Sequence, residues 1–167
     1  MDIVRLRVPY QFVRERTRMS WRDVRFGLVN ELLDPRAPVE LAIDQVGERA
    51  EPCAALLELA GADKNEPTFE LVEQLAYEEP PPSEDEIRDK WLYLVLAWFY
   101  EHRGEVADPL QRVEEVYADF GYPEQIAKFV RYMPMEGPDL GSREANECRL
   151  FKRWKRYIEE VAPTYAQ

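Results

Sequence analysis

The sequence predicts an all-α protein, built as a compact bundle or a short α-α array of eight to nine helices. Apolar residues recur at helical spacing along most of the chain, and Ser, Pro and Gly residues stand where helices would begin and end. One stretch, IVRLRV at residues 3–8, could form a short strand, but no partner run is evident. The length of 167 residues fits a single helical domain over residues 1–167.

The first well-marked helix lies in the segment that begins MSWRDV. Ser20 is expected to be its N-cap, with Asp23 as the acidic partner in a capping box. The helix should run to about Leu33 and stop before Asp34 and Pro35. Its apolar residues lie on two sides, which is typical of a helix that packs between two neighbours.

Three shorter helices are expected before the middle of the chain. Pro38 and Pro52 should stand at the first turn of two of them, in VELAIDQV and CAALLELA. Gly47 and Gly61 should end these two helices. The third, TFELVEQLAY at residues 68–77, has the apolar spacing of an amphipathic helix.

A Pro-rich connection at residues 78–83 is the clearest interruption of the helical pattern. Pro80 to Pro82 favour an extended, stiff segment. Ser83 and Glu86 should cap the longest helix, which is expected to end near Gly104. This helix contains the apolar run WLYLVLAWFY, and a membrane span needs about 20 apolar residues, so we expect a core helix. Its buried side chains should include Trp91, Leu94, Val95 and Trp98.

The stretch YADFGYPEQIAKFVRYMP, residues 117–134, predicts a corner between two helices. Its aromatic side chains mostly fit apolar helix faces, which favours a structural role. Gly121 should end the first helix in the left-handed conformation, and Pro123 should open the second. Asp119 lies at a helix C-terminus, where a carboxylate is unfavourable. We therefore expect Asp119 to be held by Arg131 or by a tyrosine hydroxyl.

The last helix is expected to follow Gly141 and Ser142 and to reach about Val161. It carries basic residues at helical spacing on one face: Arg149, Lys152, Arg153 and Arg156. Such a stripe could contact phosphate, but the chain as a whole is acidic. We therefore expect these cations to pair with the acidic middle of the chain.

Acidic charge is concentrated in the middle of the sequence. The chain has a net charge of −11, and residues 37–127 alone hold 22 acidic and 6 basic side chains. A field of this sign repels nucleic acid and attracts basic partners. The same composition also fits a solvated acidic surface that serves only solubility.

No pattern in the sequence indicates a catalytic, cofactor or metal site. His102 is the single histidine, so sites that need several histidines are excluded, and no nucleotide-binding or nucleophile motif is present. Cys53 and Cys148 lack metal spacing and lie in helical patterns, so buried thiols are expected. Carboxylates four residues apart, such as Glu115 and Asp119, arise by chance among 33 acids. We expect a protein without enzyme activity, cofactor or metal.

The N-terminal segment and the cysteine content favour a cytoplasmic protein. No apolar run follows Met1, so no secretory signal is expected. Two cysteines without a regular spacing do not indicate a disulfide framework. No membrane partner is expected.

Three segments resemble a bacterial helical family of unknown function. They are SWRDVRFGLVNELLD near the start, KWLYLVLAWFYEHR at residues 90–103, and DPLQRVEEVYADFGYPEQIAKFVRYMP at residues 108–134. Some members of that family are counted as candidate immunity proteins of polymorphic-toxin loci. The resemblance covers most of the chain and implies a helical single-domain protein, but it assigns no functional residues.

The expected function is non-catalytic binding of a basic protein partner, namely a toxin domain that is neutralised by stoichiometric binding. The alternative is a small acidic regulatory or adaptor protein with no toxin partner. The oligomeric state is open. The acidic face predicted to bind the partner consists of Glu70, Glu73, Glu78, Glu79, Glu84, Asp85, Glu86 and Asp89.

Overall fold

The computed structural model of the protein describes residues 7–166. In this part of the chain eight α-helices and two 3-10 helices form, and no strand, which confirms the all-α class. Part of IVRLRV, residues 3–6, lies outside the described residues. The helices are α1 (Tyr10–Arg16), α2 (Trp21–Val29), α3 (Ala37–Glu48), α4 (Ala54–Ala60), α5 (Phe69–Glu78), α6 (Glu84–Glu101), η1 (Arg103–Glu105), α7 (Pro109–Asp119), η2 (Glu124–Phe129) and α8 (Arg143–Tyr165).

The chain divides into two compact units. Unit 1 runs to Ile87, and unit 2 spans Arg88–Ala166. The boundary falls in the first turns of α6, a few residues after the Pro-rich connection at 78–83. The single domain expected over residues 1–167 stays a prediction. No helix in residues 7–166 is both long enough and apolar enough to cross a bilayer.

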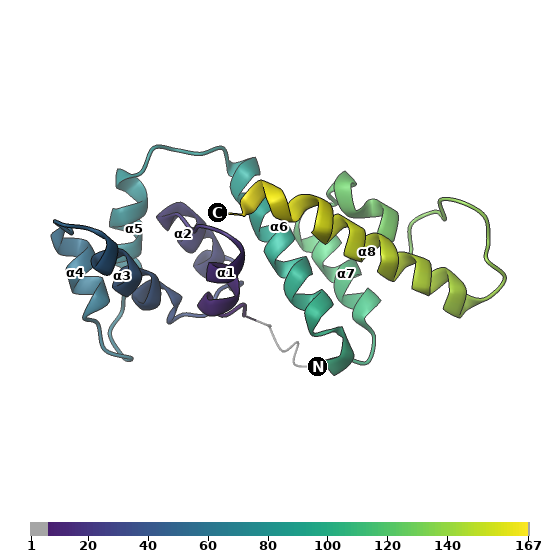
Figure 1. The fold of residues 1–167 in the computed structure, drawn as a ribbon, viewed down its shortest axis with the longest axis horizontal. Helices are drawn as coiled ribbons and strands as arrows, with labels where there is room; N and C mark the ends of the chain where they lie inside the picture. The colour runs from purple at the N-terminus through teal and green to yellow at the C-terminus, as the bar shows by residue number, and fades with distance from the viewer. Residues whose placement is uncertain (1–6, 167) are drawn as a thin grey trace. The chain divides into compact units, whose positions relative to one another are not determined.

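Unit 1 is built from α1 to α5. Helix α3 packs against α4 and α1, and α5 packs against α2 and α4 (Figure 1). Each helix turns an apolar face inward, because burying that surface is the main source of its stability. The core of the unit includes Phe12, Val13, Trp21, Val24, Leu33, Ala42, Leu56, Leu59 and Val72.

The beginning of α2 follows the predicted capping box. The Ser20 hydroxyl accepts from the Asp23 backbone N–H at 3.0 Å, and the Asp23 carboxylate accepts from the Ser20 backbone N–H at 3.0 Å. Trp21 and Val24 on the next turn are buried. Local sequence is sufficient to set this helix start, because both partners lie within four residues.

The end of α2 differs from the prediction. The helix stops at Val29 instead of Leu33, because Glu31 takes a left-handed φ of 56° and turns the chain. Leu33 then forms an isolated parallel bridge with Val8. Val29 is consequently exposed, although the sequence pattern placed it on a buried side.

Two other boundaries in unit 1 differ by a few residues. Helix α3 continues through Gly47 to Glu48, because one glycine lowers helix propensity by only about 1 kcal/mol. Helix α4 begins after Cys53, so Pro52 precedes the helix instead of opening it. Gly61 is the C-cap of α4, as predicted.

Unit 2 is organised around α6 and α8. The Trp154 indole N–H on α8 donates to the Leu96 carbonyl on α6 at 3.1 Å, inside the core. The Trp154 ring also meets Tyr100 edge-on, with ring centres 5.2 Å apart, and lies parallel to Phe129 of η2. Leu92, Leu94, Leu110, Val113 and Ile126 complete this core.

The burial of α6 confirms most of the predicted core positions. Trp91, Leu94 and Val95 are buried, whereas Trp98 is only half-buried. Trp98 stacks on His102, with ring centres 3.7 Å apart, and the His102 Nδ1 atom lies 2.8 Å from the Trp98 carbonyl oxygen. His102 therefore covers the Trp98 ring and contacts a backbone carbonyl in the last turn of α6.

The corner after α7 is built on Gly121, as predicted. Gly121 has a φ of 77° and Tyr122 follows with a φ of 60°, so two successive left-handed residues reverse the chain. The Tyr122 backbone N–H donates to the Tyr117 carbonyl at 2.8 Å. The following segment is the 3-10 helix η2 instead of an α-helix, and its Ile126 and Phe129 are buried.

Helix α8 begins after Ser142, as predicted, and ends later than predicted. The Ser142 hydroxyl accepts from the Ala145 backbone N–H at 3.1 Å. The helix extends beyond Val161 to Tyr165, with Pro163 in its last turns. Tyr165 stacks on Tyr93 of α6, which gives this terminal turn a packing partner.

The two tryptophans of unit 2 should differ in their effect on stability. We expect Trp154→Ala to lower the free energy of unfolding by about 3–5 kcal/mol, because it leaves a cavity and removes the buried hydrogen bond to the Leu96 carbonyl. Trp98→Ala should cost clearly less, because the ring is half-exposed. Urea denaturation followed by far-UV circular dichroism measures both. Equal losses would contradict the difference in burial.

Two glycines offer a matched test of the corner. Gly121→Ala should destabilise by about 1 kcal/mol through left-handed strain alone, since nothing lies within 4 Å of an added Cβ. Gly104→Ala is the control, because that site is equally open and has no positive φ. Thermal denaturation should show a loss only for the first variant.

Candidate functional site

The predicted acidic residues lie at the end of unit 1 and along the start of α6. Glu70, Glu73 and Glu78 belong to α5, Glu79 directly follows it, and Glu84 to Glu86 form the first turn of α6. Asp89 lies one turn further along α6. All eight are exposed except Glu79, which is half-buried.

Two of these carboxylates are used inside unit 1. Glu79 accepts from the backbone N–H of Trp21 at 2.6 Å and of Arg22 at 3.4 Å. A carboxylate at this position satisfies free N–H groups at the start of α2 and matches the helix dipole. Glu73 pairs with Arg25 of α2 at 3.5 Å. Glu79 and Glu73 therefore connect α5 to α2, and Glu79 in particular is a structural residue.

The remaining predicted residues are placed differently. Asp89 accepts a hydrogen bond from Gln125 of η2 at 3.1 Å, within unit 2. In residues 7–166, Glu78, Glu84 and Glu86 are exposed and pair with no basic side chain. The connection between α5 and α6 has no regular secondary structure, and Pro80 and Pro81 are exposed. The structure thus leaves a short carboxylate-rich segment, Glu78 to Glu86, open to solvent.

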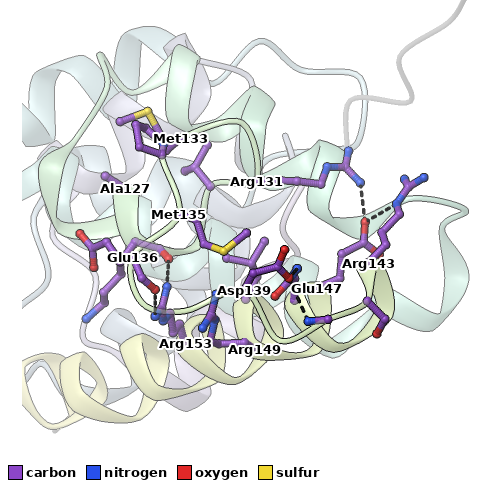
Figure 2. A pocket seen from close by; sticks show the side chains of 17 residues that line it. Ala127, Arg131, Met133, Met135, Glu136, Asp139, Arg143, Glu147, Arg149 and Arg153 are labelled. Atoms are coloured by element: carbon purple, nitrogen blue, oxygen red, sulfur yellow. Dashed lines mark hydrogen bonds and ion pairs between the residues drawn. The ribbon is translucent and has the colours of Figure 1, made fainter.

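A groove in unit 2 lies between α8 and the segment that joins η2 to α8. Its volume is about 670 Å³, within the range typical of ligand sites. Figure 2 shows Met133 and Met135 on one side and Arg149 and Arg153 reaching up from α8. Its apolar lining consists of Ala127, Val130, Met133, Pro134, Met135 and Leu150.

Arg131 fixes one end of this groove by binding three carboxylates. Its guanidinium donates to both oxygens of Asp108, at 3.0 and 2.9 Å, and to Glu114 at 3.1 Å. A longer contact of 3.5 Å reaches Glu147 on α8, which also accepts from Arg143 at 3.2 Å. Through this one side chain, α8 is connected both to the N-terminus of α7 and to the middle of α7.

The Arg131 contacts correct the first of the two partners expected for Asp119. Arg131 binds Asp108 and Glu114 on the other part of α7, so it does not act as the latch for Asp119. The paired Arg131 guanidinium holds the pKa of the Asp108 carboxyl below its usual value. Asp108 is also the N-cap residue of α7.

Arg149 and Arg153 hold the groove segment through backbone oxygens. The Arg149 Nη1 atom donates to the Pro138 carbonyl at 2.8 Å. Arg153 donates to the carbonyls of Lys128 at 3.1 Å and Glu136 at 2.7 Å. These two members of the predicted basic stripe therefore bind neutral carbonyls, not the acidic middle of the chain.

The last turn of the segment is held at the start of α8. The Asp139 carboxylate accepts from the Asn146 side chain at 3.0 Å and from the Gly141 backbone N–H at 2.9 Å. The Asn146 hydrogen bond is the main cause of a lowered Asp139 pKa. The segment is thus tied to α8 at three points along its length.

The chemistry of these side chains favours binding. In the described part of the chain no cluster of three or more His, Cys, Asp or Glu side chains is placed to hold a metal ion. The groove contains thioethers, guanidinium groups and carboxylates, but its lining includes neither cysteine nor His102. Cys53 and Cys148 are exposed instead of buried, because the helical pattern did not show which side each one faces.

Sequence reasoning did not find the groove. Its lining comes from η2, the following segment and α8, which are brought together by guanidinium–carbonyl bonds that leave no residue pattern. The one available signal was the basic stripe on the last helix. That stripe predicts pairing with carboxylates, because backbone acceptors cannot be seen in a sequence.

The fold and sites described above define a helical protein with an exposed acidic connection and a Met- and Arg-lined groove. The chain belongs to the family described as "Uncharacterized protein conserved in bacteria (DUF2247)", whose model matches residues 10–162. No curated protein and no solved structure matches the chain. The family match covers every α-helix of the described part except the last turn of α8.

The Asp108–Arg131 pair should make stability depend on acid. Because the folded pKa of Asp108 is lowered, the pair stabilises the fold above the ordinary Asp range near pH 4, and this contribution disappears as the pH falls below the folded value. Asp108→Asn should lower the melting temperature at pH 7, and the gap to wild type should close as the pH falls below the lowered pKa of Asp108 in the folded protein.

The control is Asp119→Asn on the same helix. Asp119 is exposed and is not a partner of Arg131, so this change should leave no comparable gap at either pH. A gap for Asp108→Asn that stays constant down to the acid limit would show that the carboxylate charge is not the stabilising group.

Proposed function

We propose that the protein is a non-catalytic immunity protein that neutralises a cognate bacterial toxin by stoichiometric binding through its acidic connection. The observation that carries the proposal is the exposed segment from Glu78 to Glu86. Glu78, Glu84 and Glu86 pair with no basic side chain in residues 7–166, so their charge is available to a partner. A cytoplasmic location follows from this role.

The physical properties of this segment suit a basic protein surface. Exposed carboxylates of one sign accelerate association with a cationic partner by long-range attraction. Pro80 to Pro82 restrict the backbone, so less conformational entropy is lost on docking. The same charge disfavours nucleic acid as a partner.

The two ends of the segment are fixed by the fold. Glu79 is bound to the α2 backbone, and the Ser83 hydroxyl accepts from the Glu86 backbone N–H at 3.1 Å. The carboxylates are therefore presented from defined backbone positions. A toxin with a cationic active-site cleft would bind these carboxylates in that cleft. They would occupy the place of the phosphate backbone of its nucleic-acid substrate.

The test uses a toxin domain encoded beside the gene and a charge-reversed variant. Changing Glu84, Asp85 and Glu86 to Lys should slow association about tenfold or more at low salt and flatten its salt dependence. The melting temperature should fall modestly, because lysines in the first turn of α6 oppose the helix dipole, but the protein should remain folded. Stopped-flow or surface-based kinetics at two salt concentrations gives both rates, and survival of cells that co-express the toxin reports protection.

The matched control reverses three other exposed acids of unit 1. Glu51, Glu58 and Glu66 are exposed and lie outside the connection, and changing them to Lys alters the net charge equally. This control should retain most of the wild-type rate. Equal slowing in both variants would show that only overall charge matters. A wild-type protein that neither binds nor protects would favour an adaptor without a toxin partner.

A further inference from the structure

The groove in unit 2 has an apolar body and a charged wall. Met133, Met135 and Leu150 contribute flexible or branched apolar side chains, and thioethers adapt readily to ligands of different shape. Met135 is 53% exposed, so this apolar surface is accessible from solvent. Arg149 and Arg153 form the opposite wall along α8 (Figure 2).

The charges that line the groove are not balanced along the α8 wall. At one end two cations, Arg131 and Arg143, meet three carboxylates, Glu147 and the α7 residues Asp108 and Glu114, so this end carries one surplus negative charge. Along the rest of the groove three cations, Lys128, Arg149 and Arg153, stand with two carboxylates, Glu136 and Asp139. One positive charge therefore remains in this part of the groove, although the chain as a whole is strongly acidic.

The two arginines keep unused hydrogen-bond donors. Each guanidinium has five N–H groups, and the backbone carbonyls take one from Arg149 and two from Arg153. The Nε atom of Arg149 is buried without a hydrogen-bond partner. Neutral carbonyl acceptors position these groups but do not neutralise them, so a bound anion would still gain a charge-assisted contact.

We propose that this groove binds a small apolar monoanion, namely a molecule that carries one carboxylate on an apolar body. The carboxylate lies against Arg149 and Arg153, whose planar donors match its geometry. The apolar body lies against Met133, Met135 and Leu150. A volume of about 670 Å³ accommodates a ligand of this size.

The local charge beside Arg149 and Arg153 favours a monoanion among related ligands. A neutral apolar molecule would leave the positive charge unmatched, and a dianion would exceed it. The site is independent of the proposed toxin binding, because it lies in unit 2 and attracts the opposite sign of charge. The two proposals can therefore fail separately.

The four methionines provide the measurement. In protein labelled with ¹³C at the methionine methyl groups, octanoate should shift the signals of Met133 and Met135. The signal of Met19, which is buried in unit 1, should stay in place. Octanol, which has the same apolar chain without charge, should bind about tenfold or more weakly, because it lacks the charge-assisted contact.

Two pairs of variants locate the site. Arg153→Gln should weaken octanoate binding about tenfold, whereas Arg156→Gln, an exposed site on α8 outside the groove, should not. Met135→Glu places a repelling charge in the groove, and Leu140→Glu places the same charge on the same segment outside it. Only the first of this pair should weaken binding. Both positions are exposed, so neither change should prevent folding.

Three results would overturn the inference. Absence of octanoate-dependent shifts at Met133 and Met135 removes the site, and equal binding of octanol removes the role of the charge. Tighter binding of an apolar tetrapeptide with a free C-terminus, with octanoate as a weak mimic, would make the groove a peptide site instead of a small-molecule site.

Discussion

The attachment of three carboxylates to Arg131 determines the arrangement of unit 2 around its groove. Arg131 directly follows Phe129 and Val130, which are buried, so the core fixes its backbone. Its guanidinium then binds Asp108 and Glu114 from α7 and reaches Glu147 on α8. Without this cation the three carboxylates would repel one another, which makes its contribution larger than that of a single exposed ion pair.

Unit 1 uses the reverse arrangement, in which an anion holds backbone donors. Glu79 binds the N–H groups at the start of α2, and Tyr10 donates to Asp44 at 2.6 Å between α1 and α3. Burial is the largest cause of the raised pKa of Tyr10, and the hydrogen bond to Asp44 adds to it. In both units, polar contacts between distant segments set the position of helices whose apolar faces alone would allow sliding.

The sequence predicted those features that depend on neighbouring residues. The all-α class, the cap at Ser20 and the left-handed Gly121 are confirmed, because each follows from apolar spacing or from residues within one turn. The predicted end of α2 was wrong. The bridge that Leu33 forms with Val8 joins segments that are distant in the sequence, so no local pattern indicates it.

The candidate sites show the same division. The exposure of Glu84 to Glu86 could be predicted from composition, since a run of carboxylates is rarely buried. The structural use of Glu79 could not, because its donors lie 57 and 58 residues earlier. The groove depends on carbonyl oxygens at Lys128, Glu136 and Pro138, and every residue type carries that acceptor.

The two exposed thiols, Cys53 and Cys148, are sites at which the unmodified sequence can be labelled with thiol-reactive probes. Cys53 lies in unit 1 and Cys148 in unit 2, and both are solvent-exposed. Nitroxide or fluorescent labels can therefore be placed on each unit without any substitution. The spacing of the two labels, followed by pulsed electron resonance or energy transfer, would show whether binding at the connection between α5 and α6 changes the distance between the units.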